Sequence, residues 1–162
     1  MNANTNPPRS AAEQARLDTA LTELFEQRIS FNQVLGLKVE SLRAGRVQLG
    51  FEMKPELVGH YHYGRLHGGV ISSALDALGG LALMVEIAAR HPHETAAQVM
   101  QRFTKIGTID LRVDFLRQGL GKRFIGHAEV TRLGGRVGTT QTRLTNDEGT
   151  LVATGTAAYI VS

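Results

Sequence analysis

The sequence predicts an α+β domain in which an antiparallel β-sheet wraps around one long buried helix. Residues 68–89 are apolar on every side of a helical wheel, with Asp76 the single charge between His67 and Glu86. A helix that is apolar all round is a buried helix. Residues 109–115 then alternate between apolar and polar side chains, as in a strand with one buried face. Because three more strand-like segments follow with glycine turns between them, we expect sequential antiparallel hairpins.

The length and composition predict a single domain. The chain has 162 residues and a mass of 17.6 kDa, which is enough for a hydrophobic core. Residues 1–10, rich in Asn and Pro, are expected to be a disordered tail. Leu and Phe recur at helical spacing over residues 11–30 and predict an amphipathic helix. We assign residues 31–162 to the main domain.

The remaining elements follow from periodicity and from turn residues. A strand with a turn near Ala44-Gly45 is expected over residues 38–53, followed by a loop over 56–66. A short helix is expected over 93–105, after Pro92 closes the long helix. The later strands are expected at 109–115, 123–132, 136–145 and 151–161.

The composition excludes several classes of site. There is no cysteine, so disulfides, thiol catalysis and Cys-ligated zinc are excluded. Six histidines are present, but the sequence has no HExxH motif, and we expect no metal site. The net charge of +3 fits a small anionic ligand as well as a nucleic acid. The N-terminus has no apolar signal-peptide core, which favours a cytoplasmic protein.

The long apolar stretch is also about long enough to span a membrane. Asp76 at mid-membrane would cost about 2.5–3.5 kcal/mol, and two Gly-Gly pairs interrupt the stretch. The helix predicted over residues 11–30 has too acidic a polar face to bind anionic lipid. We therefore expect a core helix and no membrane partner.

The start of the long helix and its one charge are the candidate chemical groups. Unpaired N–H groups at Gly68 and Gly69 favour negative charge, including the charge that develops on a carbonyl oxygen. A carboxylate such as Asp76 in an apolar helix is costly unless it is paired or used. Eight residues separate Gly68 from Asp76, roughly 12 Å along the helix, which is too far for one reacting bond. Two antiparallel copies would bring these groups together, so the spacing predicts a dimer with composite sites.

These residues also carry a resemblance to a known family. His67-Gly68-Gly69 with an Asp nine residues after the His resembles the hotdog-fold acyl-CoA thioesterases of the PaaI type. Residues 107–117, Gly-Thr-Ile-Asp-Leu-Arg-Val-Asp-Phe-Leu-Arg, are similar to the YigI branch of that group. The resemblance covers about residues 30–160. It implies a hotdog fold, hydrolysis of medium- to long-chain acyl-CoA, no cofactor beyond the CoA of the substrate, and a homodimer or a dimer of dimers.

The resemblance implies roles for the motif residues. Asp76 would act as base or nucleophile, and the N–H groups of Gly68 and Gly69 would polarise the thioester carbonyl. His67 is expected to be structural, bonding backbone at the helix start. Another reading makes Asp76 a structural residue that bonds a backbone amide where two chains meet.

Thr108 stands where relatives carry a Ser or Thr that orients water beside the Asp. Counting by twos from Asp110 places Thr108 on the polar face of its strand, unless the strand is broken at Gly107. Thr108 is a candidate catalytic residue on the condition of such a break.

The candidate substrate-binding residues come from several segments. Relatives carry an Asn six residues before the motif His, and here that position is Tyr61; its hydroxyl, or His60 or His62, is a candidate replacement. Arginines near the late turns suit the phosphates of CoA. The full set is Tyr61, His62, Ser72, Arg117, Arg132, Gly134 and Arg136.

Two other functions remain open from the sequence. A non-catalytic acyl-CoA-binding hotdog protein would carry the same fold and pocket. A hotdog dehydratase would need a His with a differently placed Glu or Asp. Binding to nucleic acid is not expected, because the thirty or so residues before the core are too few for a DNA-binding domain.

Overall fold

A central helix, α3 (Gly68–Arg90), is the axis of the computed structural model, which describes residues 7–162. The helix starts after His67, whose backbone is extended, and ends just before Pro92. The predicted range of 68–89 is confirmed to within one residue. By length and hydropathy α3 resembles a membrane span, yet 61% of its most apolar window is buried inside the fold. The apolar surface of α3 is therefore largely used in the core.

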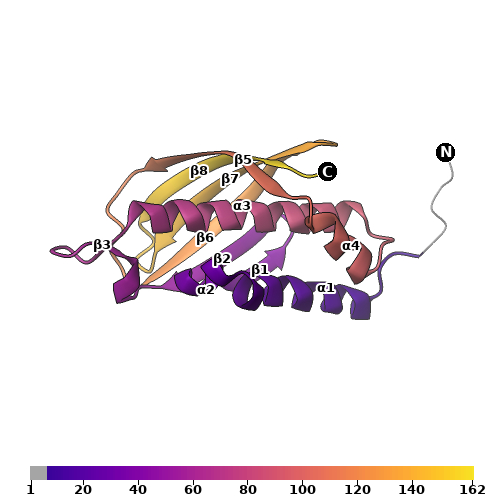
Figure 1. The fold of residues 1–162 in the computed structure, drawn as a ribbon, viewed down its shortest axis with the longest axis horizontal. Helices are drawn as coiled ribbons and strands as arrows, with labels where there is room; N and C mark the ends of the chain where they lie inside the picture. The colour runs from indigo at the N-terminus through magenta and orange to yellow at the C-terminus, as the bar shows by residue number, and fades with distance from the viewer. Residues whose placement is uncertain (1–6) are drawn as a thin grey trace.

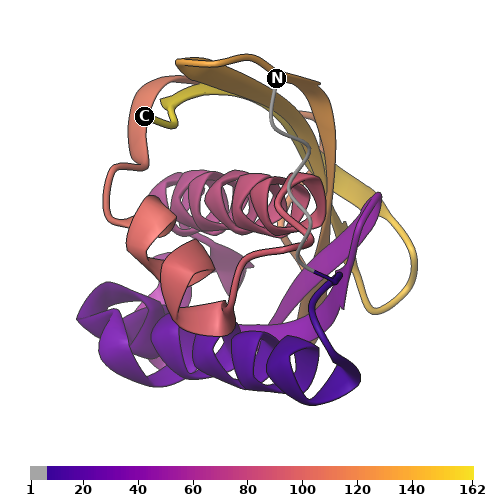
Figure 2. The same ribbon diagram turned by 90° about the vertical axis from the view of Figure 1, so that its right-hand side faces the viewer.

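A six-stranded antiparallel sheet curves around α3 (Figures 1 and 2). The strand order is β1-β2-β6-β7-β8-β5, so β1 and β5 are the two edges. The predicted strand over 38–53 is confirmed as a hairpin that turns at Gly45, where φ is 72°. The bounds are β1 (Lys38–Arg43), β2 (Arg46–Glu52), β5 (Gly107–Phe115), β6 (Arg123–Leu133), β7 (Val137–Asn146) and β8 (Leu151–Ile160). This sheet wrapped on one long helix is the hotdog fold that the resemblance implied.

Glycines on the inner face of the sheet let α3 approach closely. A Cβ atom built on Gly126 would lie 2.7 Å from Leu78 Cδ2, and one on Gly138 would lie 2.5 Å from Leu83 Cδ2. Both leucines are fully buried. The core therefore lies between the concave face of the sheet and α3, where close packing stabilises the fold.

The N-terminal segment packs on the other side of α3, away from most of the sheet (Figure 2). It consists of α1 (Ala11–Glu23), a π-helical turn η1 (Leu24–Arg28) and α2 (Ser30–Leu35). The helix expected over 11–30 is continuous from Ala11 to Arg28, although its last turn is π-helical, and it ends at Ile29, whose backbone is extended. The helix α2 ends at Gly36, whose φ of 73° is left-handed.

The remaining elements are short. They are a 3₁₀ turn η2 (Pro55–Leu57), a small hairpin of β3 (Val58–His60) and β4 (Arg65–Leu66), and α4 (Ala96–Phe103). The region predicted as a loop over 56–66 therefore contains a hairpin. The helix predicted over 93–105 is shorter, because Thr95 and Gln98 form a capping box at its start.

The tail predicted over residues 1–10 lies mostly outside the described residues. In the described part, Arg9 donates hydrogen bonds to the carbonyls of Ala88 (2.9 Å) and Glu94 (2.8 Å). A cation at the carboxyl end of a helix is electrostatically favourable. Arg9 thus ties the start of the chain to the end of α3.

Candidate active site

Asp76 lies on α3 and forms a side-chain hydrogen bond with Thr108. The Thr108 hydroxyl donates to Asp76 Oδ1 at 2.9 Å, linking the first half of α3 to the edge strand β5. This bond orients the carboxylate through Oδ1, and Oδ2 is the oxygen that Thr108 does not occupy. The two residues that the sequence placed 32 positions apart are thereby brought together.

A β-bulge explains how Thr108 reaches the helix. The register of β5 against β8 shifts between Thr108, opposite Tyr159, and Asp110, opposite Ala158, so Ile109 is an extra residue. An extra residue resets the alternation of side chains along a strand. Counting by twos from Asp110 therefore gives the wrong face for Thr108. The break in the strand lies at Ile109 rather than at Gly107.

Tyr159 on β8 supports the turn of α3 that carries Asp76. Its hydroxyl donates to the backbone carbonyl of Asp76 at 2.9 Å, and its side chain is almost fully buried. Burial raises the pKa of Tyr159, and the nearby charge of Asp76 raises it further. The phenol therefore stays protonated as a donor. Gly79 makes room for it, since a Cβ there would overlap the Tyr159 hydroxyl.

A cavity of about 290 Å³ opens beside Asp76. Three parts of the chain form its walls: α3, the β5–β8 edge and the N-terminal helices. Most of the lining is apolar with a few polar groups, which is typical of a small-molecule site. The lining residues are Phe25, Ile29, Phe31, Asn32, Ser73, Asp76, Ala77, Gly80, Ile106, Gly107, Thr108 and Tyr159.

The two candidate glycines at the start of α3 differ in the hydrogen bonding of their N–H groups. The Gly69 N–H donates to His67 Nδ1 at 2.9 Å, so His67 caps the helix. The Gly68 N–H makes no hydrogen bond within residues 7–162. The ring of Phe115 lies over Gly68, 3.4 Å from where a Cβ would be. Gly68 is therefore the residue whose amide is available to a ligand.

The other candidates near this end of α3 are held by local contacts. The Ser72 hydroxyl donates to the Gly68 carbonyl at 3.0 Å, and Arg117 Nη1 donates to the Leu151 carbonyl at 3.3 Å. Tyr61 is 84% exposed at the tip of the β3–β4 hairpin, and its ring lies 4.1 Å, centroid to centroid, from the tilted ring of the exposed His62. Within one chain the structure does not bring this hairpin tip to the Asp76 cavity.

The remaining candidates lie at the opposite end of the molecule. Arg132 and Arg136 flank the β6–β7 turn, where the Gly134 N–H donates to the Val137 carbonyl at 2.9 Å. This turn adjoins the end of α3, since Arg90 Nη1 donates to the Leu133 carbonyl at 2.8 Å. Along α3 that end is roughly 21 Å from Asp76. Within one chain, a ligand must be long to contact both the β6–β7 turn and Asp76.

Sequence reasoning missed Asn32, Gly80 and Tyr159 at the cavity. The second Gly-Gly pair, Gly79-Gly80, interrupts the apolar stretch in the sequence. Two residues without side chains inside a helix indicate either a close contact with another element or a space beside the helix. Nothing in the local sequence marks Asn32. Its place at the cavity depends on the break in helix geometry at Ile29.

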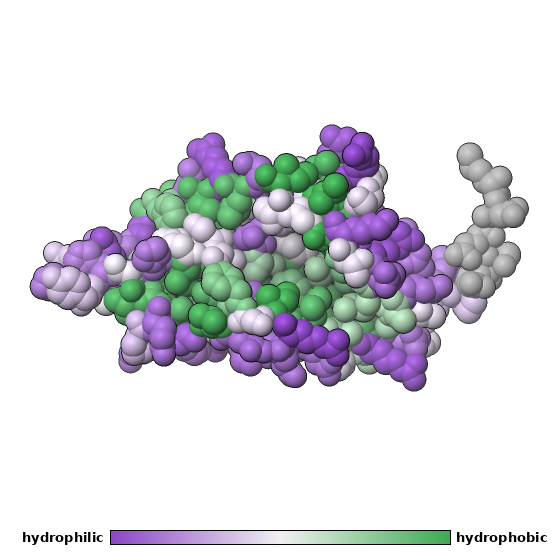
Figure 3. Space-filling model, viewed as in Figure 1, coloured by the Kyte–Doolittle hydropathy of each residue, from purple (hydrophilic) through white to green (hydrophobic). Residues whose placement is uncertain are grey.

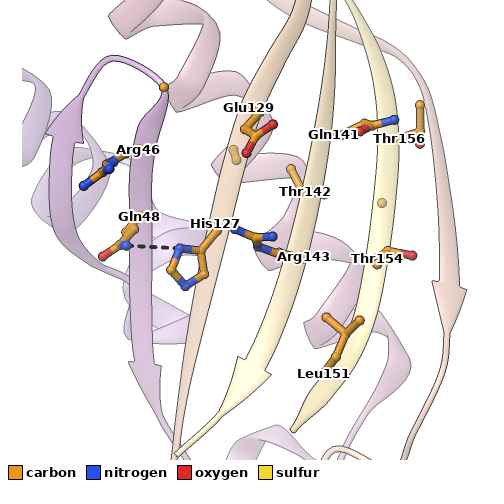
Figure 4. Close-up of a pocket in the computed structure, with 13 residues that line it drawn as sticks. Arg46, Gln48, His127, Glu129, Gln141, Thr142, Arg143, Leu151, Thr154 and Thr156 are labelled. Atoms are coloured by element: carbon orange, nitrogen blue, oxygen red, sulfur yellow. Dashed lines mark hydrogen bonds between the residues drawn. The ribbon is translucent and has the colours of Figure 1, made fainter. Parts of the chain in front are cut away.

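A second, larger concavity of about 730 Å³ lies on the outer face of the sheet, away from α3 (Figure 4). Its lining is polar, and Gln48 Nε2 lies 3.0 Å from His127 Nδ1. Burial lowers the pKa of His127, as does the charge of Arg143. No group of three or more potential metal ligands is found here or elsewhere in the described part of the chain. None of the predicted catalytic residues lies in this concavity.

Comparison with known proteins identifies the family. The profile of the family described as "Thioesterase superfamily" matches residues 63–153, which include Gly68, Asp76 and Thr108. The chain belongs to the thioesterase superfamily. It is 39% identical over 139 residues to the medium/long-chain acyl-CoA thioesterase YigI of Escherichia coli K12, covering 86% of this chain and 90% of the relative.

Solved structures agree with this assignment. A Shewanella oneidensis protein related to the thioesterase superfamily has a TM-score of 0.88 and 38% identity, over 94% of this chain and 100% of that one. A candidate thioesterase from Syntrophus aciditrophicus has a TM-score of 0.82 and 34% identity, over the same shares. This thioesterase is therefore an enzyme of the thioester hydrolase class. Its N-terminal helices lie outside the matched residues 63–153.

Proposed function

We propose that this thioesterase hydrolyses acyl-CoA of medium to long chain length to the free acid and CoA. The carboxylate of Asp76, oriented by Thr108 and facing an apolar cavity, carries the proposal. The medium/long-chain acyl-CoA thioesterase activity of the YigI relative supports the substrate class. The apolar walls suit an acyl chain, and a thioester needs no cofactor to be hydrolysed by a base and a polarising donor.

In the proposed reaction Asp76 acts as general base. Asp76 takes a proton from water as the water oxygen bonds to the thioester carbon, and the carbonyl oxygen becomes an oxyanion. The Gly68 N–H of the partner subunit stabilises that charge. Collapse re-forms the carbonyl and breaks the C–S bond, and the proton passes from Asp76 to the sulfur. Direct attack by Asp76 is the alternative, and a single turnover in ¹⁸O-water that labels Asp76 would establish it.

The proposed site is composite because a single chain holds Asp76 and Gly68 apart. The exposed face between β5 and α2 supports a two-fold pairing: exposed Ile109 and Phe115 lie on β5, and exposed Phe31 lies on α2. Apolar side chains gather on this face (Figure 3). Contiguous exposed apolar surface is typical of protein interfaces. Antiparallel packing of two α3 helices here brings each Asp76 toward the other Gly68; a dimer of dimers is compatible with it.

The proposed substrate path places CoA outside the acyl cavity. Arg117 follows Phe115, whose ring lies over Gly68 at the start of α3, and the Arg132–Arg136 turn lies near the other end of α3. Both places carry guanidinium groups suited to phosphate. Tyr61 and His62 project from an exposed tip and are proposed to contact CoA bound across the dimer. We place the enzyme in the cytoplasm, with no nucleic acid or membrane partner.

The test is release of free CoA across a series of acyl chain lengths. We expect Asp76→Asn to lose turnover by a factor on the order of 10² or more while still binding acyl-CoA. Gly68→Pro removes the free N–H at a position where proline is compatible with a helix start. The backbone of His67, with φ −67° and ψ 139°, suits a residue before proline. We expect kcat to fall about 10²- to 10³-fold.

Glu86→Gln is the matched control, because Glu86 is a carboxylate on the same helix that pairs with Arg90. It is expected to leave turnover unchanged. Full turnover by Asp76→Asn would overturn the proposal.

A further inference from the structure

We propose that Asn32 is a positioning residue that holds the attacking water beside Asp76. This inference rests on the proposed function and adds a role for a residue of the N-terminal segment. It depends on three observations: a buried amide without a partner, its place in the Asp76 cavity, and the hydrogen bond that already occupies one oxygen of Asp76.

The first observation concerns the side-chain amide of Asn32. The residue is only 4% exposed, and its Nδ2 is buried with no hydrogen-bond partner in the described structure. A buried polar group without a partner destabilises a fold, so such groups are rare and call for an explanation. The neighbouring Leu35 on α2 is buried as expected for an apolar side chain, whereas an amide at Asn32 is not explained by packing.

The second observation is where Asn32 lies. It lines the same cavity as Asp76 and Thr108, on the wall formed by the N-terminal helices. Its neighbours on that wall are Phe25, Ile29 and Phe31, which offer no side-chain hydrogen bonds. The partner for the amide is therefore to be sought inside the cavity.

The third observation concerns which oxygen of the Asp76 carboxylate already accepts a hydrogen bond. The Thr108 hydroxyl donates to Asp76 Oδ1, so Oδ2 is the oxygen left for a water molecule. A water that donates one O–H to Oδ2 has a second O–H and a lone pair to orient. An asparagine amide offers both a donor and an acceptor, and it carries no charge that would compete for the proton. Asn32 and Asp76 thus hold the water from two sides, with a lone pair directed at the thioester carbon.

The reaction itself is unchanged by this role. The water oxygen still bonds to the carbonyl carbon, Asp76 still takes the proton, and the C–S bond still breaks with that proton passing to sulfur. Asn32 fixes the orientation of the water, and orientation is a large part of the rate when a bound reactant must attack along one direction.

Local backbone geometry explains how Asn32 reaches the cavity. The extended backbone at Ile29 separates the π-helical turn η1 from α2, and Gly36 ends α2 in the left-handed region. These two breaks set the direction of a six-residue helix with Asn32 in its first turn. π-Helical turns are frequent at functional sites.

The test compares Asn32→Leu with Gln33→Leu in the full-length enzyme. Gln33 is an exposed amide on the same helix that does not line the cavity. Its Nε2 donates to the Gln27 carbonyl, so Gln33→Leu is a matched control for the loss of an amide on α2. We expect Asn32→Leu to lower kcat by a factor on the order of 10 to 100, with Gln33→Leu close to wild type. Binding of a non-hydrolysable acyl-CoA thioether is expected to be unchanged, because Asn32 acts on water. Combined with Asp76→Asn, Asn32→Leu should cause no further loss, since both act on one step.

Asn32→Asp keeps the size of the side chain and provides a second readout. A second carboxylate beside Asp76 disfavours loss of the proton there, so the acid limb of the pH–rate profile should move to higher pH. This variant also serves if Asn32→Leu fails to fold. Wild-type kcat in Asn32→Leu, additive losses in the double variant, or an unmoved pH profile would overturn the inference. Turnover that survives in Asp76→Asn would instead overturn the proposed function.

Discussion

Two adjacent glycines in α3 have opposite surroundings. A Cβ on Gly79 would overlap the Tyr159 hydroxyl and lie 2.8 Å from Thr140 Oγ1. A Cβ on Gly80 would meet nothing within 4 Å, and Gly80 lines the Asp76 cavity. Gly79 therefore allows the sheet to approach the helix, and Gly80 leaves space in the cavity beside Asp76.

We expect alanine at these two positions to change stability in opposite directions. Gly79→Ala should lower the free energy of unfolding by about 1–3 kcal/mol through overpacking, and should lower turnover by displacing Tyr159 from the Asp76 carbonyl. Gly80→Ala should raise the free energy of unfolding by about 0.5–1 kcal/mol, because alanine favours the helix. Urea denaturation of the two variants measures this. Changes of the same sign would show that the two surroundings are misassigned.

At the residue scale the sequence predicted that the candidate catalytic carboxylate is Asp76, but it predicted only part of the surroundings of this residue. Asp76 was evident because it is the single charge in a long apolar stretch. The face of Thr108 was wrong under strict alternation, since a bulge leaves no mark in the side-chain pattern. The structural role expected for His67 is confirmed by its hydrogen bond from the Gly69 N–H. Which glycine amide that bond occupies, and the cavity position of Asn32, depend on backbone geometry. Only the folded chain determines that geometry.

At the scale of elements, Glu13 joins the N-terminal segment to α4. Its carboxylate accepts a hydrogen bond from the Ala96 N–H at 3.0 Å, at the start of α4. That hydrogen bond, and one from Arg16, hold the pKa of Glu13 below its ordinary value of 4.5. A group with a lowered pKa in the folded state stabilises the fold above its unfolded pKa. That contribution is lost as the pH falls through the folded pKa.

We therefore expect Glu13→Gln to reduce the acid sensitivity of the enzyme. The variant should be less stable than wild type at pH 7, and the difference should shrink as the pH falls below about 4.5. Urea denaturation at pH 7 and at acidic pH measures both. Glu129→Gln, at an exposed position on β6, is the control. A stability difference that stays constant with pH would contradict the role of the Glu13 carboxylate.

The central helix and the late strands were predictable because glycine and proline bound their periodic segments. The N-terminal break was not. Leu17, Leu21 and Phe25 are all buried, so the apolar spacing continues into the π-helical turn as it would through one helix. The β3–β4 hairpin was missed for a different reason: β4 has two residues, too few to show alternation.

At the scale of the whole molecule, the proposed dimer divides each site between two chains. Asp76 belongs to one subunit and the Gly68 amide to the other. An isologous pairing then contains two such sites related by a two-fold axis. Variants defective in different halves of the site therefore complement each other.

We expect a mixture of Asp76→Asn and Gly68→Pro chains, unfolded and refolded together, to recover activity. Random assortment makes about half of the dimers mixed, and each mixed dimer has one site with both groups intact. Activity should reach about a quarter of wild type, measured as CoA release. Each variant refolded alone is the control. No recovery, with mixed dimers present by mass spectrometry, would show that a site uses one chain only.

The edge strand β5 also affects how a subunit behaves when it is separated from the proposed dimer. Among residues 7–162 no strand pairs with its outer side. It exposes Ile109 and Phe115, and the exposed Leu116 follows directly after it. An exposed, apolar strand edge is a template for uncontrolled pairing, and a bulge such as that at Ile109 is one of the few features that blunt it. We therefore expect dilution of the proposed dimer, or a mutation in its interface, to produce aggregates rather than stable, inactive monomers.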